Sequence, residues 1–201
     1  MHRRLFLFGT ASILAGCDTT VPSDLTEGVT RADQYAAEPF AVRPVDRSRY
    51  APEFRPQRIA KTTGEEPGTI VVDTEARQLF LIEDAYTVMR YGVAVGASEH
   101  RWRGIAHVGR MAKWPAWYPT DDMHAQTSGL PRRIEPGPSN PLGARALYLF
   151  AGGRDTLYRI HGTSEPWTIG TEASSGCIRL VNEDIIELFE RVQMYAKVIV
   201  I

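Results

Sequence analysis

Hydrophobic and polar positions divide the chain into three stretches. Residues 5–15 form an apolar run, whereas residues 18–67 are polar, contain six prolines and keep no sustained apolar period. In the third stretch, short runs of β-branched and aromatic residues recur between glycines and prolines. We therefore expect a signal segment at 1–17, a Pro-containing tether at 18–67 that packs partly on the domain, and a folded domain at 68–201.

Short apolar runs in the third stretch predict β-strands. Residues 69–73 and 78–82 have the composition of two strands joined by a turn, which predicts a hairpin. Many short strands predict a mainly β fold of the sandwich or barrel type. Further strands are expected at 87–95, 105–111, 146–150, 157–160 and 197–201.

One helix and one long loop interrupt these strands. Ile185, Ile186 and Phe189 share a helical face, and Asn182 is the expected N-cap. Residues 114–143 are rich in Pro and Gly, and because loops of that length are usually functional, we expect a lid or a substrate wall. Four aromatic residues near this loop are candidates either for lining a groove or for ordinary packing: Trp102, Trp114, Trp117 and Tyr118.

The N-terminus has the features of a bacterial export signal. Residues 1–4 are basic, and the apolar run that follows is shorter than the roughly 20 residues of a permanent membrane span. Its end, Leu-Ala-Gly-Cys17, resembles a lipobox, which implies lipidation of Cys17 and a membrane anchor. Asp18 resembles an inner-membrane retention signal. Arg3 and Arg4 fit either a twin-arginine signal or the basic region of a general secretion signal, and both routes predict a periplasmic protein.

Charge and cysteine content narrow the possible functions. The chain has 23 Lys and Arg against 24 Asp and Glu, so no net field steers it to nucleic acid. Of its two cysteines, Cys17 is assigned to the lipid, which leaves Cys177 without a disulfide partner. An unpaired thiol in an oxidising compartment indicates either deep burial or a chemical use.

This cysteine and a histidine lie in two short motifs, His161-Gly162 and Ser-Ser-Gly-Cys-Ile-Arg at 174–179. A cysteine nucleophile reacts as the thiolate, and a nearby imidazole and the cation Arg179 both favour that form. Gly176 permits a tight bend that can aim its own N–H and that of the cysteine at one oxyanion. The alternative is a buried structural cysteine and a histidine with purely structural hydrogen bonds.

With these motifs, the chain resembles the L,D-transpeptidase (YkuD) catalytic domain family over about residues 40–201. The resemblance implies that Cys177 is the nucleophile, that His161 is its general base and acid, and that the carbonyl of Gly162 orients the imidazole. It also implies support from residues that form the oxyanion hole, orient the base or contact substrate: Gly162, Ser174, Ser175, Gly176 and Arg179.

Two positions depart from the family pattern. Many relatives carry His or another basic residue where Ser175 stands, so this chain lacks a cation there. Residues 102–105, Trp-Arg-Gly-Ile, replace a Thr-Pro-Thr-Gly segment that is common in relatives. Both departures bear on how substrate is contacted.

The resemblance implies an enzyme that forms 3-3 cross-links in peptidoglycan through a thioester on Cys177. The donor is a tetrapeptide stem, and the acceptor is the side-chain amine of a diamino acid in a neighbouring stem. Alternatives are an L,D-carboxypeptidase, a lipoprotein-anchoring transferase, a cysteine peptidase of other specificity, and a catalytically idle peptidoglycan-binding lipoprotein. No cofactor is expected, and no HExxH or CxxC motif supports a zinc site built from His107, His124, His161 and Cys177.

Overall fold

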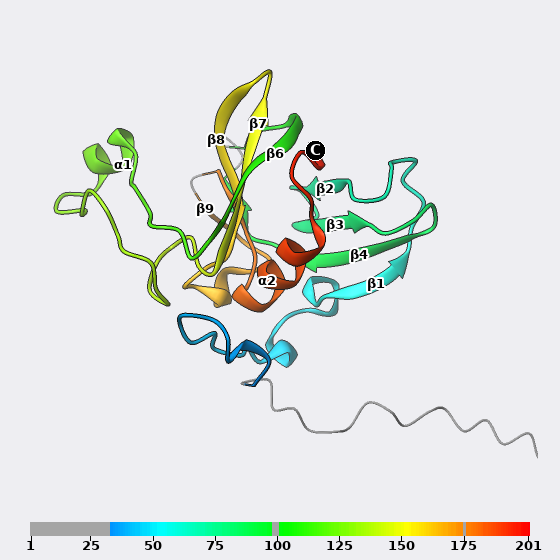
Figure 1. Cartoon of the computed structure of the whole chain (residues 1–201), viewed down its shortest axis with the longest axis horizontal. Helices are drawn as coiled ribbons and strands as arrows, with labels where there is room; N and C mark the ends of the chain where they lie inside the picture. The colour runs from blue at the N-terminus through cyan, green and yellow to red at the C-terminus, as the bar shows by residue number, and fades with distance from the viewer. Residues whose placement is uncertain (1–32, 98–100, 175) are drawn as a thin grey trace, which may run out of the picture.

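A computed structural model describes residues 33–97, 101–174 and 176–201 of the chain. The signal segment, Cys17, Asp18 and Ser175 lie outside these described residues. Strands dominate the structure (Figure 1), and the predicted mainly β class is confirmed. The strands and α-helices are β1 (Gln57–Ala60), β2 (Ile70–Asp73), β3 (Gln78–Ile82), β4 (Thr87–Gly92), β5 (Val95–Gly96), β6 (Gly104–Lys113), α1 (Asp121–Gln126), β7 (Arg145–Ala151), β8 (Arg154–His161), β9 (Glu172–Ser174), β10 (Ile178–Arg179), α2 (Asn182–Arg191) and β11 (Lys197–Val200).

Most of these strands belong to one mixed sheet. Within the described residues, nine strands follow the order β1-β4-β3-β2-β11-β6-β7-β8-β10, and β5 pairs with β9 separately. The predicted hairpin is confirmed, because β2 and β3 pair antiparallel with Ile70 opposite Leu81. Strand β11 joins the two halves of the large sheet by pairing parallel with β2 and antiparallel with β6. The halves run in different directions, with α2 lying between them (Figure 1).

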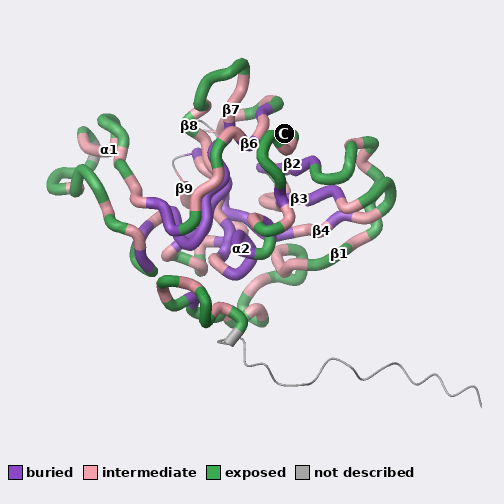
Figure 2. The backbone as a smooth tube through the Cα atoms, viewed as in Figure 1, coloured by how far each residue is buried: buried purple, intermediate pink, exposed green. Residues whose placement is uncertain are grey.

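Both halves of the sheet bury one face in a common core. Ile70 from β2, Leu147 from β7, Ile160 from β8 and Ile185 from α2 are fully buried members of it. Burial is concentrated in α2 and in the strands beside it (Figure 2). Because each buried Leu or Ile side chain contributes about 1.5–3 kcal/mol, this core fixes the position of β8 and of its neighbour β10.

Helix α2 lies where the sequence predicts it, but it begins differently. Val181 occupies the N-cap position without a side-chain hydrogen bond, so the predicted N-cap at Asn182 is wrong. The Oδ1 atom of Asn182 instead accepts a hydrogen bond of 2.9 Å from the backbone N–H of Ala144, which is fully buried. A buried N–H without a partner costs about 1–3 kcal/mol, so this tertiary contact outweighs a local cap.

Residues 33–60, which we call the strap, pack along α2 before they join the edge of the sheet as β1 (Figure 1). The ring of Phe40 lies 5.0 Å from the ring of Trp114, and Val42 is buried in the same cluster. Phe54 packs against a second cluster that contains Ile169. The boundary between tether and domain at residue 67 stays a prediction.

Two buried charge clusters fasten the strap. Arg145, which is 1% exposed, forms an ion pair with Glu38, and Trp114 Nε1 donates to the same carboxylate at 2.6 Å. Arg47 binds Asp184 at 2.6 and 2.9 Å, and it also reaches Glu183 at 3.2 Å. Both acidic residues lie in the first turn of α2, so the strap binds the start of this helix.

Residues 114–143, which we call the wall segment, leave the sheet after β6 and return at β7. Its two ends meet where the N–H of Trp114 donates to the carbonyl of Ala144 at 2.8 Å. The segment contains the short helix α1, which the sequence analysis did not predict, with Thr120 as its N-cap. Among the described residues, no helix is long and apolar enough to cross a membrane.

Candidate active site

The parallel strands β8 and β10 bring the two sequence motifs together. Ile178 lies opposite Ile160 and Arg179 lies opposite His161 in this ladder. The two isoleucines are buried in the core. Because side chains alternate along a strand, His161 and Arg179 face the other side of the sheet, together with Cys177 one residue before β10. Cysteine and histidine therefore share one face on neighbouring segments.

His161 is buried and held in one tautomer. Its Nδ1 atom lies 2.6 Å from the carbonyl oxygen of Gly162. A carbonyl oxygen only accepts, so Nδ1 carries the proton and Nε2 is left as the proton acceptor. Burial lowers the pKa of His161 to about 3, and the charges of Arg179 and Arg159 lower it as well, against the opposing effect of Gly162. The imidazole is therefore neutral at physiological pH.

Gly162 belongs to the motif because there is no space for a side chain. A Cβ atom at this position would lie 2.2 Å from Asn182 Oδ1 and 2.9 Å from the N–H nitrogen of Ala144. Gly143 is crowded by the same amide oxygen and also has a φ of 63°, a conformation that favours glycine. Two glycines and Asn182 thus form a close-packed junction directly behind the histidine.

Cys177 is partly exposed and its thiol is protonated at rest. Desolvation raises its pKa, although a backbone hydrogen bond from Arg159 and the charges of Arg159 and Arg179 act in the opposite direction. Its Sγ lies 3.9 Å from the carbonyl oxygen of Leu157. Arg179 favours the thiolate, as expected from the sequence, but desolvation of the thiol acts more strongly in the opposite direction, which no sequence motif indicated.

The loop before Cys177 is tightly braced by Ser174. Its hydroxyl donates to the carbonyl of Cys177 at 2.6 Å and accepts from the N–H of Gly176 at 3.1 Å. The N–H of Gly176, expected to be free for an oxyanion, is therefore engaged in this structure. Gly96 in β5 passes so close that a Cβ on it would lie 2.6 Å from the Cα of Gly176. Ser175 lies outside the described residues.

Cys177 opens on a pocket of about 290 Å³. The wall segment supplies one side of it with Trp117, Tyr118 and Met123, and its role as a lid or a substrate wall stays a prediction. The other two aromatic candidates serve in packing: Trp114 is buried, and Trp102 packs on the main core. The wall segment also contributes Ala116, Thr120 and Leu142. The rest of the lining comes from the sheet and the chain around it: Arg110, Tyr148, Leu157 and Arg159.

Arg159 is a site residue that the sequence analysis did not identify. It lies two residues before His161 on β8, and its guanidinium stacks 4.6 Å from the ring centre of Tyr148. The sequence did contain a signal for Arg159: side chains alternate along a strand, so a residue two positions before the candidate base lies on the same face as that base. A residue at this position therefore deserves testing in any similar motif.

Arg179 links the site to the loop that follows His161. Its guanidinium forms an ion pair of 3.1 Å with Glu165.

Within the described part of the chain, no three His, Cys, Asp or Glu side chains gather closely enough to hold a metal ion. Fold and site together define a mainly β domain that presents a cysteine and a neutral histidine on one face.

Comparison with known proteins gives the family. Residues 67–200 match the model of the YkuD family, the L,D-transpeptidase catalytic domain, and the chain therefore belongs to this family. The chain is 34% identical over 149 residues to Probable L,D-transpeptidase YbiS of Escherichia coli K12, covering 71% of this chain and 47% of that protein. It is 33% identical over 152 residues to Probable L,D-transpeptidase ErfK/SrfK of the same strain, covering 73% and 47%.

The chain thus spans about half the length of the curated relatives it matches. A crystal structure from Brucella melitensis is 46% identical with a TM-score of 0.51, and the match covers 71% of this chain and 91% of that one. That protein is named a probable carnitine operon oxidoreductase, a name that differs from those of the other relatives. The family assignment here rests on the family model.

Proposed function

We propose that this protein is an L,D-transpeptidase that forms 3-3 cross-links in bacterial peptidoglycan. The observation that carries the proposal is the placement of Cys177 and a neutral His161 on one face of neighbouring segments, where His161 Nε2 accepts no hydrogen bond from the described residues. A neutral imidazole is the form that a general base requires. The pocket at Cys177 supports the proposal because it gives a peptide carbonyl access to the thiol.

The first step acylates Cys177. His161 Nε2 takes the thiol proton while Sγ forms a bond to the carbonyl carbon between the diamino acid and the terminal D-alanine of the donor. The tetrahedral intermediate collapses as the C–N bond breaks, and His161 returns the proton to the leaving D-alanine amine. Because desolvation raises the pKa of the Cys177 thiol, the step includes transfer of the thiol proton to His161.

The second step transfers the acyl group to an amine. The side-chain amine of a neighbouring stem attacks the thioester carbonyl and gives its proton to His161, and the C–S bond then breaks. The released thiolate recovers the proton from His161. We assign supporting roles to Ser174 and Gly176 in bracing the loop, to Gly162 in orienting the base, and to Arg179 in stabilising negative charge, with Ser175 kept as a supporting residue.

We further propose that the protein is exported and anchored by lipid on Cys17 at the periplasmic side of the membrane, the inner membrane being favoured by Asp18. The support is the basic and apolar N-terminal pattern that ends in Leu-Ala-Gly-Cys. Labelling with a fatty-acid analogue should mark the wild-type chain. A Cys17→Ser variant that is still labelled would overturn the lipidation proposal.

Product analysis tests the proposed activity. The full-length chain and its Cys177→Ala variant are purified in detergent and incubated with disaccharide tetrapeptide, and the products are identified by mass spectrometry. Cys177-dependent cross-linked dimers are the expected result. Tripeptide alone would indicate L,D-carboxypeptidase action, and no change in the substrate would favour a lipoprotein-anchoring transferase or an idle binding protein.

A further inference from the structure

The pocket on which Cys177 opens is positively charged. Two arginines, Arg110 and Arg159, line it, and no acidic side chain is found among the described residues of its lining. An arginine side chain stays protonated in proteins, so both groups carry their charge in the resting site. Most of the other lining residues are apolar or aromatic. A cation in such a pocket favours a ligand that carries a carboxylate.

A row of residues across the sheet places Arg110 on the same face as the nucleophile. Arg110 of β6 lies opposite Tyr148 of β7, and Tyr148 lies opposite Arg159 of β8. The parallel ladder of β8 and β10, extended by one residue, sets Cys177 beside Arg159. All four residues line the one pocket. Arg110 is therefore separated from the nucleophile by two residues of the row.

Tyr148 positions the guanidinium of Arg110. The ring of Tyr148 is only 7% exposed, and the guanidinium lies 4.5 Å from its centre. Arg159 contacts the same ring at 4.6 Å. A guanidinium that stacks on an aromatic face keeps the N–H groups in its own plane available to an acceptor. The exposed Arg110 side chain is thus held in place without using its donors.

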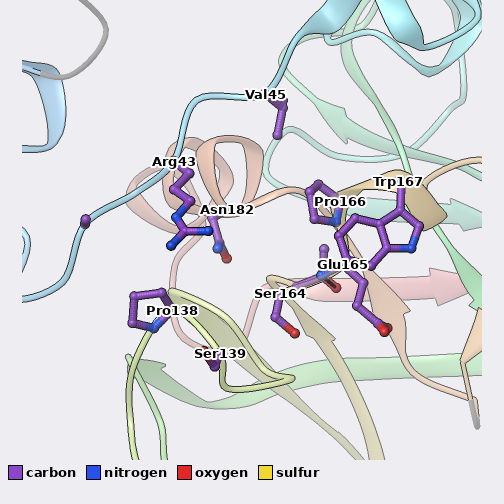
Figure 3. A pocket seen from close by; sticks show the side chains of 11 residues that line it. Arg43, Val45, Pro138, Ser139, Ser164, Glu165, Pro166, Trp167 and Asn182 are labelled. Carbon is purple, nitrogen blue, oxygen red and sulfur yellow. Dashed lines mark hydrogen bonds between the residues drawn. The ribbon is translucent and has the colours of Figure 1, made fainter.

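Arg110 has no carboxylate partner within the described residues. The two other arginines near the nucleophile do have one, since Arg159 binds Asp155 at 3.1 Å and Arg179 binds Glu165 at 3.1 Å. Glu165 lines a separate pocket between the strap and the loop after β8 (Figure 3). That pocket shares no lining residue with the pocket of the nucleophile. The unpaired cation therefore lies in the pocket where the donor must bind.

We propose that Arg110 binds the terminal carboxylate of the donor stem peptide and thereby aligns the donor for attack by Cys177. This inference rests on the proposed transpeptidase function. The terminal carboxylate belongs to the departing D-alanine, and one residue spans at most about 3.6 Å, so this carboxylate lies close to the attacked carbonyl. The pocket, of about 290 Å³, is at the lower limit of ligand pockets and has room for the end of the stem.

The test compares two donors that differ only in the charge of this group. Disaccharide tetrapeptide and its C-terminal amide lose D-alanine and D-alaninamide respectively, and both leave the same acyl group on Cys177. The kcat/KM of acylation is measured by intact mass spectrometry with each donor, for the full-length wild type and for Arg110→Gln. Arg154→Gln is the matched control, because Arg154 is an exposed arginine of β8 that does not line the pocket.

The wild type should prefer the carboxylate donor to the amide by about tenfold to a hundredfold, the range for loss of a hydrogen bond between charged groups. Arg110→Gln should lose most of this preference because it slows acylation by the carboxylate donor alone, and Arg154→Gln should keep it.

A purely structural role for Arg110 would slow acylation by both donors equally and leave the preference unchanged, and that result would overturn the inference. A wild type that uses both donors equally well would overturn it too, although the chemistry of Cys177 would then stand. If neither donor forms an adduct on Cys177 of the wild type, the proposed function itself fails and takes the inference with it.

Discussion

Glu38→Ala should be the most damaging single change in the strap. Glu38 is the ion-pair partner of Arg145, whose side chain is only 2% exposed, and it also accepts from the indole of Trp114. Removing one partner of a buried ion pair costs about 3–5 kcal/mol, because the remaining charge stays buried. Glu190, at 3.8 Å from Arg145 and 57% exposed, compensates in part, so we expect a value near the lower end, about 3 kcal/mol.

Urea unfolding followed by fluorescence measures this loss, and Glu135→Ala is the matched control. Glu135 also pairs with an arginine, Arg133, but both side chains are exposed, so its loss should cost less than about 1 kcal/mol. Glu38→Gln should fall between the two because it keeps the shape and loses the charge. A loss of less than about 1 kcal/mol for Glu38→Ala, or one equal to that of the control, would show that the strap is not fastened by this pair.

Three further predictions concern the site itself. The pKa of His161 is about 3 in the folded protein, so only the unfolded chain takes up a proton there as the pH falls below about 6.5. The wild type should therefore lose about 2–3 kcal/mol more stability between pH 7 and pH 4.5 than His161→Gln. Equal losses of stability in urea unfolding would contradict a buried neutral imidazole. Alkylation of Cys177 by iodoacetamide should show a midpoint above that of free cysteine, and a midpoint below pH 7 would contradict a resting thiol. Gly96→Ala should reduce turnover at least about tenfold by pushing on Gly176, with a stability cost of about 1–3 kcal/mol. Gly129→Ala, at a glycine with a φ of 77° whose Cβ would meet open space, should leave turnover unchanged, and a similar loss of turnover in both variants would contradict the proposed contact.

The strands with a clear local pattern were predictable from the sequence, whereas β1, in the predicted tether, and the short strands β9 and β10 were not. The hairpin of β2 and β3 has short apolar runs and a turn between them, and these signals need no distant partner. Asn182 shows the opposite case, since its side chain serves the N–H of Ala144, 38 residues away in sequence. The Asn182 side chain could cap its own helix or accept from the buried N–H of Ala144. The residues around Asn182 do not show this distant donor, so the predicted N-cap was wrong.

The candidate site shows the same division. His161 and Cys177 were found because their motif neighbours are informative, and Gly162 has a steric reason to be present. The protonation state of Cys177 depends on how strongly the folded chain desolvates the thiol, which no motif contains. Partial packing of the tether on the domain was predicted, but the buried ion pairs that hold residues 33–60 were not, because their partners are distant in the sequence.

Direct observation of the acyl-enzyme tests the central claim most closely. Full-length protein is mixed with disaccharide tetrapeptide, quenched in acid within the first turnovers, and analysed by intact mass and by peptide mapping. We predict a mass increase equal to the donor minus D-alanine, located on Cys177 as a thioester and absent from Cys177→Ala. Cross-linked product that forms without this adduct, or an adduct on another residue, would contradict the assignment of Cys177 as the nucleophile.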